Sequence, residues 1–229
     1  MPRVSCVMFA AKHLSPETVK GRRVLDVGAR DYNGSMRPLL EQWGCSEYVG
    51  IDMEPGPGVD IVMNADHSLE HFGHDSFDIV ICLEMMEHTR HWRTSLHNIK
   101  AVCKPEGLVL MTAPAISYPY HGVYADFWRY QPEDFQALFK DLEIVQTEFD
   151  PQCPGSFVAA RKPAIFQEAD LTNYELFSVV NGRRCLELND SDYQNGYFRR
   201  ILWKLRLKNW AQNGLLAAGR LVARLLRLR

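Results

Sequence analysis

The segment over residues 114–132, PAISYPYHGVYADFWRYQP, contains several side chains that could take part in chemistry. His121 and Asp126 are candidates for a general base that removes a proton from a hydroxyl group, and His88 is a third candidate. Arg129 could bind a phosphate or a carboxylate, although an ion pair with Asp126 fits its position equally well. A base must reach its proton at hydrogen-bond distance, so the fold has to bring these residues together.

Aromatic rings are unusually frequent in the same segment. Rings exposed at this density suggest a lid over a substrate, and we expect Tyr120, Tyr124 and Trp128 to contact it. The alternative is that most of the rings pack beneath the loop as a small additional core. The rings concerned are Tyr118, Tyr120, Tyr124, Phe127, Trp128 and Tyr130.

No metal site is expected from the sequence. His67, His71 and His74 share one predicted loop, but no cysteine or carboxylate at matching spacing completes a set of ligands. The six cysteines include no CxxC pair, so they indicate neither a structural zinc site nor a disulfide framework.

A glycine and an acidic residue stand where two predicted strands end. Gly28 follows the apolar run Val24–Val27, and a glycine there lets backbone approach a ligand closely. Asp52 ends the run EYVGID, where a carboxylate can accept hydrogen bonds from both hydroxyls of a ribose.

Apolar and β-branched runs alternate with stretches of helical spacing, which predicts βαβ units in a doubly wound Rossmann-like α/β sheet of about seven strands. Two runs separated by PQCPG predict a final antiparallel hairpin. Ligands of such sheets bind at the carboxyl ends of the strands. Strands are predicted at 24–28, 47–52, 59–63, 77–83, 107–113, 142–150 and 156–161. Helices are predicted over 4–20, from a cap at Ser35 to about Trp43, over 90–102 and over 132–139.

Four blocks of the sequence resemble the motifs of class I S-adenosylmethionine (SAM)-dependent methyltransferases. VLDVGARDYNGS resembles the first motif, VLDVGCGxG, and EYVGID resembles the second strand with its acidic end. FDIVICLEMMEH and KPEGLVLMTAP resemble the fourth- and fifth-strand motifs. The blocks follow the order of that family and span residues 22–114. The resemblance implies SAM as the cofactor.

The resemblance also implies which residues hold the cofactor. Asp26, Gly28, Arg30, Asp52, Met53, Asp66, Leu83 and Glu84 are the expected contacts. Asp66 matches the position that holds the adenine amino group, although it could instead cap its loop. Glu84 lies at the methionine end of the cofactor, although Glu84 and Glu87 could instead cap the following helix.

The first motif departs from the family pattern at Arg30, where a second glycine is usual. Arg30 could pair with the cofactor's carboxylate or with Asp31, and the sequence does not decide between them. A nicotinamide-dependent dehydrogenase is the main competing class, but its phosphate-binding turn needs three glycines as GxGxxG, and only Gly28 and Gly34 are present.

The segment YHGVYADFWRYQPEDF resembles a stretch, YHxxPxDYWRxTPxGL, of methyltransferases that accompany bacterial glycan and cell-surface polysaccharide synthesis. Asp134 departs from that form, which has glycine there. The resemblance implies methyl transfer to a sugar hydroxyl of a surface glycan or lipid-linked intermediate. The alternatives are a small-molecule or protein-nitrogen acceptor, and a SAM-binding scaffold without catalysis.

Charge divides the chain into a body and a tail. Residues 198–229 contain nine of the 26 basic residues and no acidic one. We expect a methyltransferase domain over 1–163, a connecting segment over 164–197 and a basic amphipathic helical tail over 198–229. Such a tail suits the surface of an anionic membrane, although it could instead dock on protein. A nucleic-acid partner is not expected, because the body is acidic and has no recognised nucleic-acid module.

The first residues, MPRVSCVMFAAKHL, include too short an apolar run for a signal peptide. We therefore expect a cytoplasmic protein that can associate peripherally with the inner face of the membrane.

Overall fold

The computed structural model describes residues 3–122, 126–150, 153–208 and 210. Seven strands form the main sheet: β1 (Arg23–Val27), β2 (Glu47–Asp52), β3 (Ile61–Val62), β4 (Phe77–Leu83), β5 (Cys103–Pro114), β7 (Glu143–Asp150) and β8 (Gly155–Arg161). Their order is β3-β2-β1-β4-β5-β8-β7. The first five run parallel, and β8 is antiparallel to both of its neighbours. The expected Rossmann-like sheet with an antiparallel last strand is confirmed.

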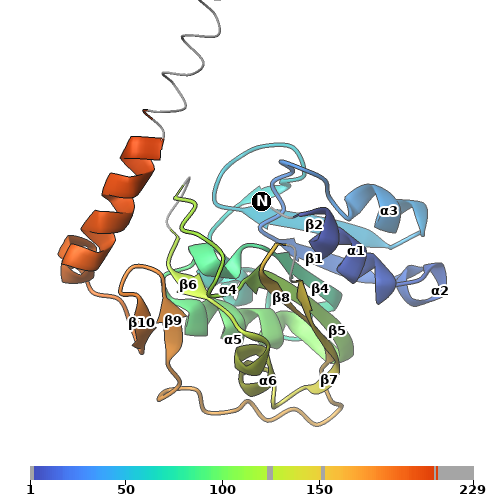
Figure 1. The fold of residues 1–229 in the computed structure, drawn as a ribbon. Helices are drawn as coiled ribbons and strands as arrows, with labels where there is room; N and C mark the ends of the chain where they lie inside the picture. Colours follow the sequence, from blue (N-terminus) through green and yellow to red (C-terminus); the bar gives the residue numbers. More distant parts are fainter. Residues whose placement is uncertain (1–2, 123–125, 151–152, 209, 211–229) are drawn as a thin grey trace, which may run out of the picture.

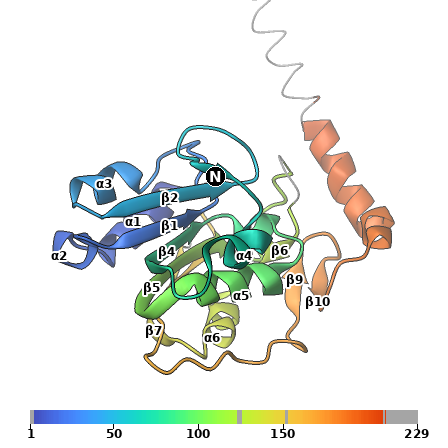
Figure 2. The ribbon, with the colours of Figure 1, turned by 180° about the vertical axis from the view of Figure 1, so that it is seen from behind.

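Helices cover both faces of this sheet (Figures 1 and 2). They are α1 (Val4–Lys12), α2 (Pro16–Val19), α3 (Arg37–Gln42), α4 (Ser68–Phe72), α5 (Trp92–Val102) and α6 (Pro132–Leu138). Val24 and Ile81 belong to the core shared with α1 and α3, whereas Leu25 and Val80 belong to the core shared with α5 and α6. Because both faces are buried, the inner strands are apolar at almost every position.

Strand and helix boundaries differ from the predicted ones mainly where the chain enters an element. β3 is shorter than predicted and β5 begins at Cys103 instead of Gly107. The first helical stretch is divided by Ser15, which caps α2. Ser35 does not cap α3 directly; its hydroxyl accepts a hydrogen bond from the N–H of Arg37, one residue beyond the cap.

A second sheet, which the sequence did not indicate, lies beside the first. It consists of β6 (Trp128–Arg129), β9 (Leu176–Ser178) and β10 (Arg183–Cys185), all antiparallel in the order β10-β9-β6. The segment expected only to connect domain and tail therefore pairs with the aromatic segment that follows β5.

The tail begins as a helix over residues 196–208, drawn in orange and standing away from the sheet in Figure 1. Phe198 is buried against the body, while Trp203 and Leu207 are exposed. The second half of the predicted basic tail lies outside the described residues. Among the described helices, none is long and apolar enough to cross a membrane.

Candidate active site

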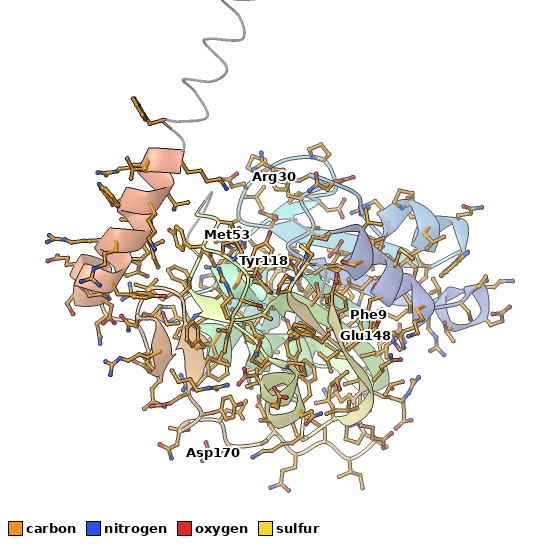
Figure 3. The ribbon with its side chains drawn as sticks, in the orientation of Figure 1. Phe9, Arg30, Met53, Tyr118, Glu148 and Asp170 are labelled. Carbon is orange, nitrogen blue, oxygen red and sulfur yellow. The ribbon has the colours of Figure 1, made fainter. Side chains whose placement is uncertain are left out.

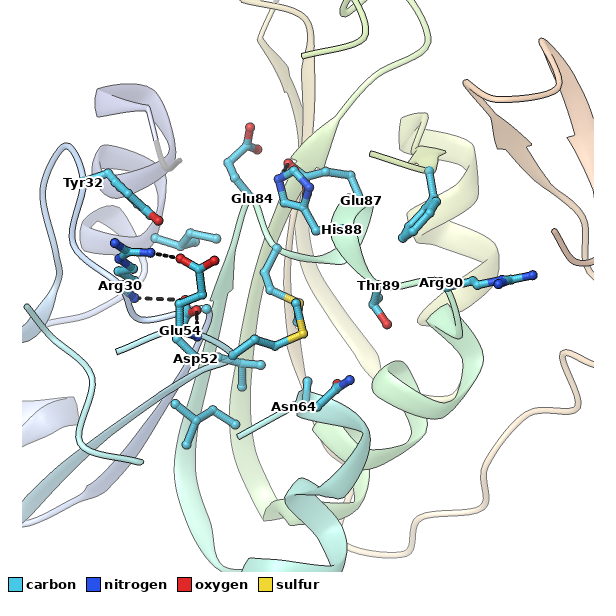
Figure 4. A pocket seen from close by; sticks show the side chains of 18 of the residues that line it. Arg30, Tyr32, Asp52, Glu54, Asn64, Glu84, Glu87, His88, Thr89 and Arg90 are labelled. Atoms are coloured by element: carbon cyan, nitrogen blue, oxygen red, sulfur yellow. Dashed lines mark hydrogen bonds and ion pairs between the residues drawn. The ribbon is translucent and has the colours of Figure 1, made fainter. Parts of the chain in front are cut away.

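A cavity of about 540 Å³ opens at the carboxyl ends of β1, β2 and β4 (Figure 4). Its volume falls within the range of roughly 300–1,000 Å³ that is common for small-molecule sites. Of the residues predicted from sequence, those lining it are Gly28, Arg30, Asp52, Met53, Asp66, Leu83, Glu84, His88 and His121. The expected cofactor side and two of the three candidate bases thus share one cavity.

Gly28 forms the turn that follows β1. Its φ is +85°, and an added Cβ would lie 2.7 Å from the Cβ of Met85. Its N–H donates to the carbonyl of Ile51 at 2.9 Å, which ties the turn to β2. Both the backbone conformation and the close contact require glycine.

Asp52 is held in a fixed orientation at the end of β2. One carboxylate oxygen accepts from the N–H of Arg30 at 3.3 Å, and the other accepts from the N–H of Glu54 at 3.0 Å (Figure 4). Each oxygen keeps further acceptor capacity for a ligand hydroxyl. The geometry is therefore compatible with the ribose contact predicted for Asp52.

Arg30 has a partner in the structure that was not considered from sequence. Its guanidinium pairs with Glu54 and lies 4.7 Å from the centroid of the Tyr32 ring. The charge that replaces the usual glycine is thus balanced within the rim of the cavity.

Asp66 lies in the turn that precedes α4. The loop is capped by Asn64, whose side-chain oxygen accepts from the N–H of Asp66 at 3.0 Å. The carboxylate of Asp66 accepts a hydrogen bond from the hydroxyl of Ser95. Capping is therefore the role of Asn64, and the Asp66 carboxylate lies at the cavity.

Glu84 follows β4 in a left-handed conformation, with φ of +57°, and its buried carboxylate pairs with Arg3 at 3.1 Å. Non-glycine residues rarely adopt this conformation, and those that do are frequent at functional sites. Neither Glu84 nor Glu87 caps α5, because His91 occupies the cap and the first turn contains no acidic residue.

Asp26 does not line the cavity but lies beneath it, buried within β1. Burial raises the pKa of its carboxyl group to about 6, although the hydrogen bond from the Tyr48 hydroxyl, at 2.6 Å, acts in the opposite direction.

Two histidines and one glutamate meet at the inner side of the cavity. The Nε2 atoms of His88 and His121 are 3.4 Å apart. Oε1 of Glu87 lies 3.5 Å from Nε2 of His88 and 3.9 Å from Nε2 of His121. Burial, reinforced by the charge of Glu84, raises the pKa of Glu87 to about 8.

Asp126 lies behind this group and does not reach the cavity. It is buried, with Oδ2 3.0 Å from Nδ1 of His121, and it forms a two-pronged ion pair with Arg129 at 2.5 and 2.8 Å. Burial alone would raise its pKa, but the bonds from Arg129 and His121 outweigh burial and hold the pKa well below its ordinary value. Asp126 therefore orients His121 and is not itself placed to meet a substrate.

Three of the residues predicted to contact the acceptor, Tyr120, Trp128 and Arg129, do not line the cavity. Arg129 is fully buried on Asp126 and on carbonyls of the preceding loop, and Trp128 is fully buried with its ring N–H on the carbonyl of Thr89. Tyr120 packs against Phe198. Tyr124 lies outside the described residues. Most of these rings pack as the additional core considered above, and Tyr118 and Phe127 line the cavity in their place.

Glu87 is the main site residue that was missed. It lies within FDIVICLEMMEH, three residues after Glu84. The motif was recognised, but it was not predicted that the Glu87 side chain faces the cavity. Arg3, Asn64, Met85 and Thr89 also line the cavity, and no sequence signal distinguished them.

An open sheet of this order, with a cavity across the carboxyl ends of β1, β2 and β4, defines an α/β enzyme that binds a nucleotide-like cofactor. The chain belongs to the methyltransferase domain family, whose model matches residues 5–176, and it is a SAM-dependent methyltransferase. Comparison with curated proteins gives no match.

Solved structures share the fold at low sequence identity. An N1-methyltransferase of Burkholderia thailandensis, solved with 1,6-didemethyltoxoflavin and S-adenosylhomocysteine, has a TM-score of 0.55 and 16% identity, covering 69% of this chain and 79% of its own. A SAM-dependent methyltransferase of Mesorhizobium loti has a TM-score of 0.51 and 15% identity, covering 68% of this chain and 98% of its own.

Proposed function

We propose that this methyltransferase acts on a hydroxyl group of a sugar, carried by a surface glycan or a lipid-linked intermediate. Support for an oxygen acceptor comes from His121, whose Nδ1 lies 3.0 Å from Asp126 while Nε2 is directed to the group at the cavity. Support for a sugar is the resemblance of the segment around residues 120–135 to glycan-associated methyltransferases.

The cofactor would be held by groups already in place. Asp52 would accept from the ribose, Asn64 and Asp66 lie where the adenine is expected, and Gly28 and Leu83 would flank the methionine portion. Bound SAM supplies a methyl group on a sulfonium, which is an excellent leaving group. Alignment of the acceptor oxygen therefore contributes much of the acceleration.

Proton removal falls to the histidines in this proposal. The hydroxyl proton would pass to Nε2 of His121 as its oxygen attacks the methyl carbon. Asp126 holds His121 in place, because its Oδ2 accepts from the His121 backbone N–H at 2.9 Å and lies 3.0 Å from Nδ1, and Arg129 fixes Asp126 in turn.

His121→Ala tests this assignment. We expect turnover to fall about 10²- to 10⁴-fold, the usual contribution of a positioned base. SAM affinity measured by calorimetry should be unchanged. The exposed His74, outside the cavity, provides the matched control His74→Ala. An equal loss of SAM affinity and turnover would refute the role as base.

Transfer of labelled methyl from SAM to fractions of a cell-envelope extract tests the acceptor. Label in a glycan or glycolipid fraction is the expected result. Label only in small metabolites or in protein would favour the alternative acceptors, and SAM binding without transfer to any fraction would favour the scaffold.

We also propose that the tail attaches the enzyme to an anionic membrane surface. In the described part, Trp203, Leu207 and Trp210 recur at helical spacing and are exposed, and Arg200 and Lys204 are exposed beside them. Exposed aromatic and cationic side chains on one helix are typical of interfacial anchors.

A further inference from the structure

The group formed by Glu87, His88 and His121 has the composition and the dimensions of a metal site. Its three facing atoms are two imidazole nitrogens and one carboxylate oxygen, separated by 3.4, 3.5 and 3.9 Å. A point equidistant from all three lies about 2.1 Å from each, which matches zinc–nitrogen and zinc–oxygen bonds of about 2.0–2.2 Å.

The Glu87 side chain provides an independent indication. It is 1% exposed, and its Oε2 atom has no hydrogen-bond partner among the described residues. Leaving a buried carboxylate oxygen without a donor is costly, and a bound cation is one of the few groups that satisfy it.

The surroundings of His121 point in the same direction. Metal-binding histidines usually give their second ring nitrogen to a carboxylate, which fixes the ring and its tautomer. Asp126 stands at that position, 3.0 Å from Nδ1, and is itself fixed by Arg129. The same carboxylate oxygen accepts from the backbone N–H of His121 at 2.9 Å, which fixes the residue at the cavity.

We infer that Glu87, His88 and His121 bind a divalent transition-metal ion at the inner side of the SAM cavity. Two imidazoles and one carboxylate suit ions such as Zn²⁺, Mn²⁺ and Co²⁺, and three protein ligands leave positions for an exogenous oxygen. This departs from the expectation from sequence, which considered only His67, His71 and His74.

The role of the ion rests on the sugar-hydroxyl acceptor of the proposed function, and it replaces the proton transfer to His121 that is proposed there. The acceptor hydroxyl oxygen would occupy an open position, where the ion lowers its pKa and the O–H proton passes to solvent. An oxygen electron pair then forms the bond to the methyl carbon as the carbon–sulfur bond breaks, and the electrons of that bond remain on sulfur. His88 and His121 would act as ligands, and the ion would replace a histidine in activating the hydroxyl.

Binding of the metal alone tests the site without cofactor or acceptor. Chelator-treated protein is titrated with Zn²⁺ and Co²⁺ by calorimetry and with Mn²⁺ by electron paramagnetic resonance. We expect one ion per chain in the wild type and in His74→Ala. Glu87→Gln and His121→Ala should lose binding, and Asp126→Asn should weaken it about 10- to 100-fold.

Circular dichroism and SAM affinity serve as the folding controls for these variants. The inference is overturned if none of the three ions binds, or if Glu87→Gln and His121→Ala bind them as tightly as wild type does. Methyl transfer that persists in chelator would also overturn it while leaving the proposed function intact. Metal binding without any methyl transfer would leave the site in place and refute the proposed function.

Discussion

Asp26 and Asp126 are both buried carboxylates near the cavity, yet their surroundings act on them in opposite ways. Asp126 faces the Arg129 guanidinium and the His121 ring, and these bonds hold its pKa low despite burial. Among the residues that the structure describes, the Tyr48 hydroxyl is the one side-chain donor to Asp26, and burial raises the pKa of Asp26 to about 6. One carboxylate stays charged to position a neighbour, and the other is easily protonated.

Asp26 should make the stability of the enzyme depend on pH between about 4 and 6. Its pKa of about 6 in the folded chain exceeds the ordinary value of 3.8, so the folded state retains a proton that the unfolded state releases. Its contribution to stability is complete below the lower value and is lost as pH rises through the higher one. Asp26→Asn cannot ionise and still accepts from Tyr48, so it should gain stability over wild type across that window, on the order of a few kcal/mol.

Urea unfolding of both proteins at steps from pH 4 to pH 7 measures this difference. Comparing the two removes the effect of all other titrating groups. A difference in unfolding free energy that stays constant across the range would contradict the raised pKa.

At the scale of single residues, the sequence predicted which residues end a strand better than it predicted where their side chains point. Gly28 and Asp52 were placed correctly at the cavity because they end strands, and strand ends follow from the apolar runs before them. The burial of Trp128 and the inward orientation of Glu87 were not predicted. Both depend on contacts with segments that are distant in the sequence. Chain periodicity carries no information about such contacts.

At the scale of elements, Arg93 fastens the chain after β8 onto α5. Its guanidinium donates to the carbonyls of Leu171, Tyr174 and Leu186, at 2.6–2.9 Å. These bonds hold the chain before β9 and the chain after β10 beside the helix. The segments that flank the second sheet therefore share one side chain of α5 as the donor of three backbone contacts.

Arg93→Ala should loosen this segment selectively. Hydrogen bonds from a charged donor to backbone typically contribute on the order of 2 kcal/mol. We expect a lower melting temperature and faster hydrogen exchange in residues 171–186, with SAM affinity unchanged. Arg161→Ala is the matched control, because Arg161 is exposed and donates to a single carbonyl, that of Glu106. Exchange that accelerates evenly over the whole chain would contradict a local fastening.

The inner strands β1, β4 and β5 of the main sheet were predicted from sequence because they are buried on both faces and therefore form apolar runs. β6, β9 and β10 have only two or three residues each, and β6 pairs with β9 across a long stretch of sequence. Strands that short show no periodicity, so the second sheet could be found only from the folded chain.

At the scale of the whole molecule, the proposed membrane attachment and the SAM cavity lie in different parts of the chain. The structure shows where a truncation of the tail can begin. Phe198 is buried and Ile201 and Leu202 pack on the core, whereas Trp203 is exposed. Removing residues 203–229 should therefore abolish sedimentation with vesicles containing anionic lipid while leaving SAM affinity unchanged. Equal sedimentation of both forms would refute the anchor, and binding only to neutral vesicles would refute its electrostatic basis.

The packing of α1 on β8 has a consequence for how the protein is made. The Phe9 ring lies 5.2 Å from the Phe157 ring, and Arg3 donates to the carbonyl of Cys153. Helix α1 is synthesised before β8, so it completes its core only when that strand emerges from the ribosome. Until then the apolar face of α1 stays exposed and accessible to chaperones. The fold is therefore completed only after the β7–β8 hairpin has been synthesised, and it does not form progressively from the N-terminus.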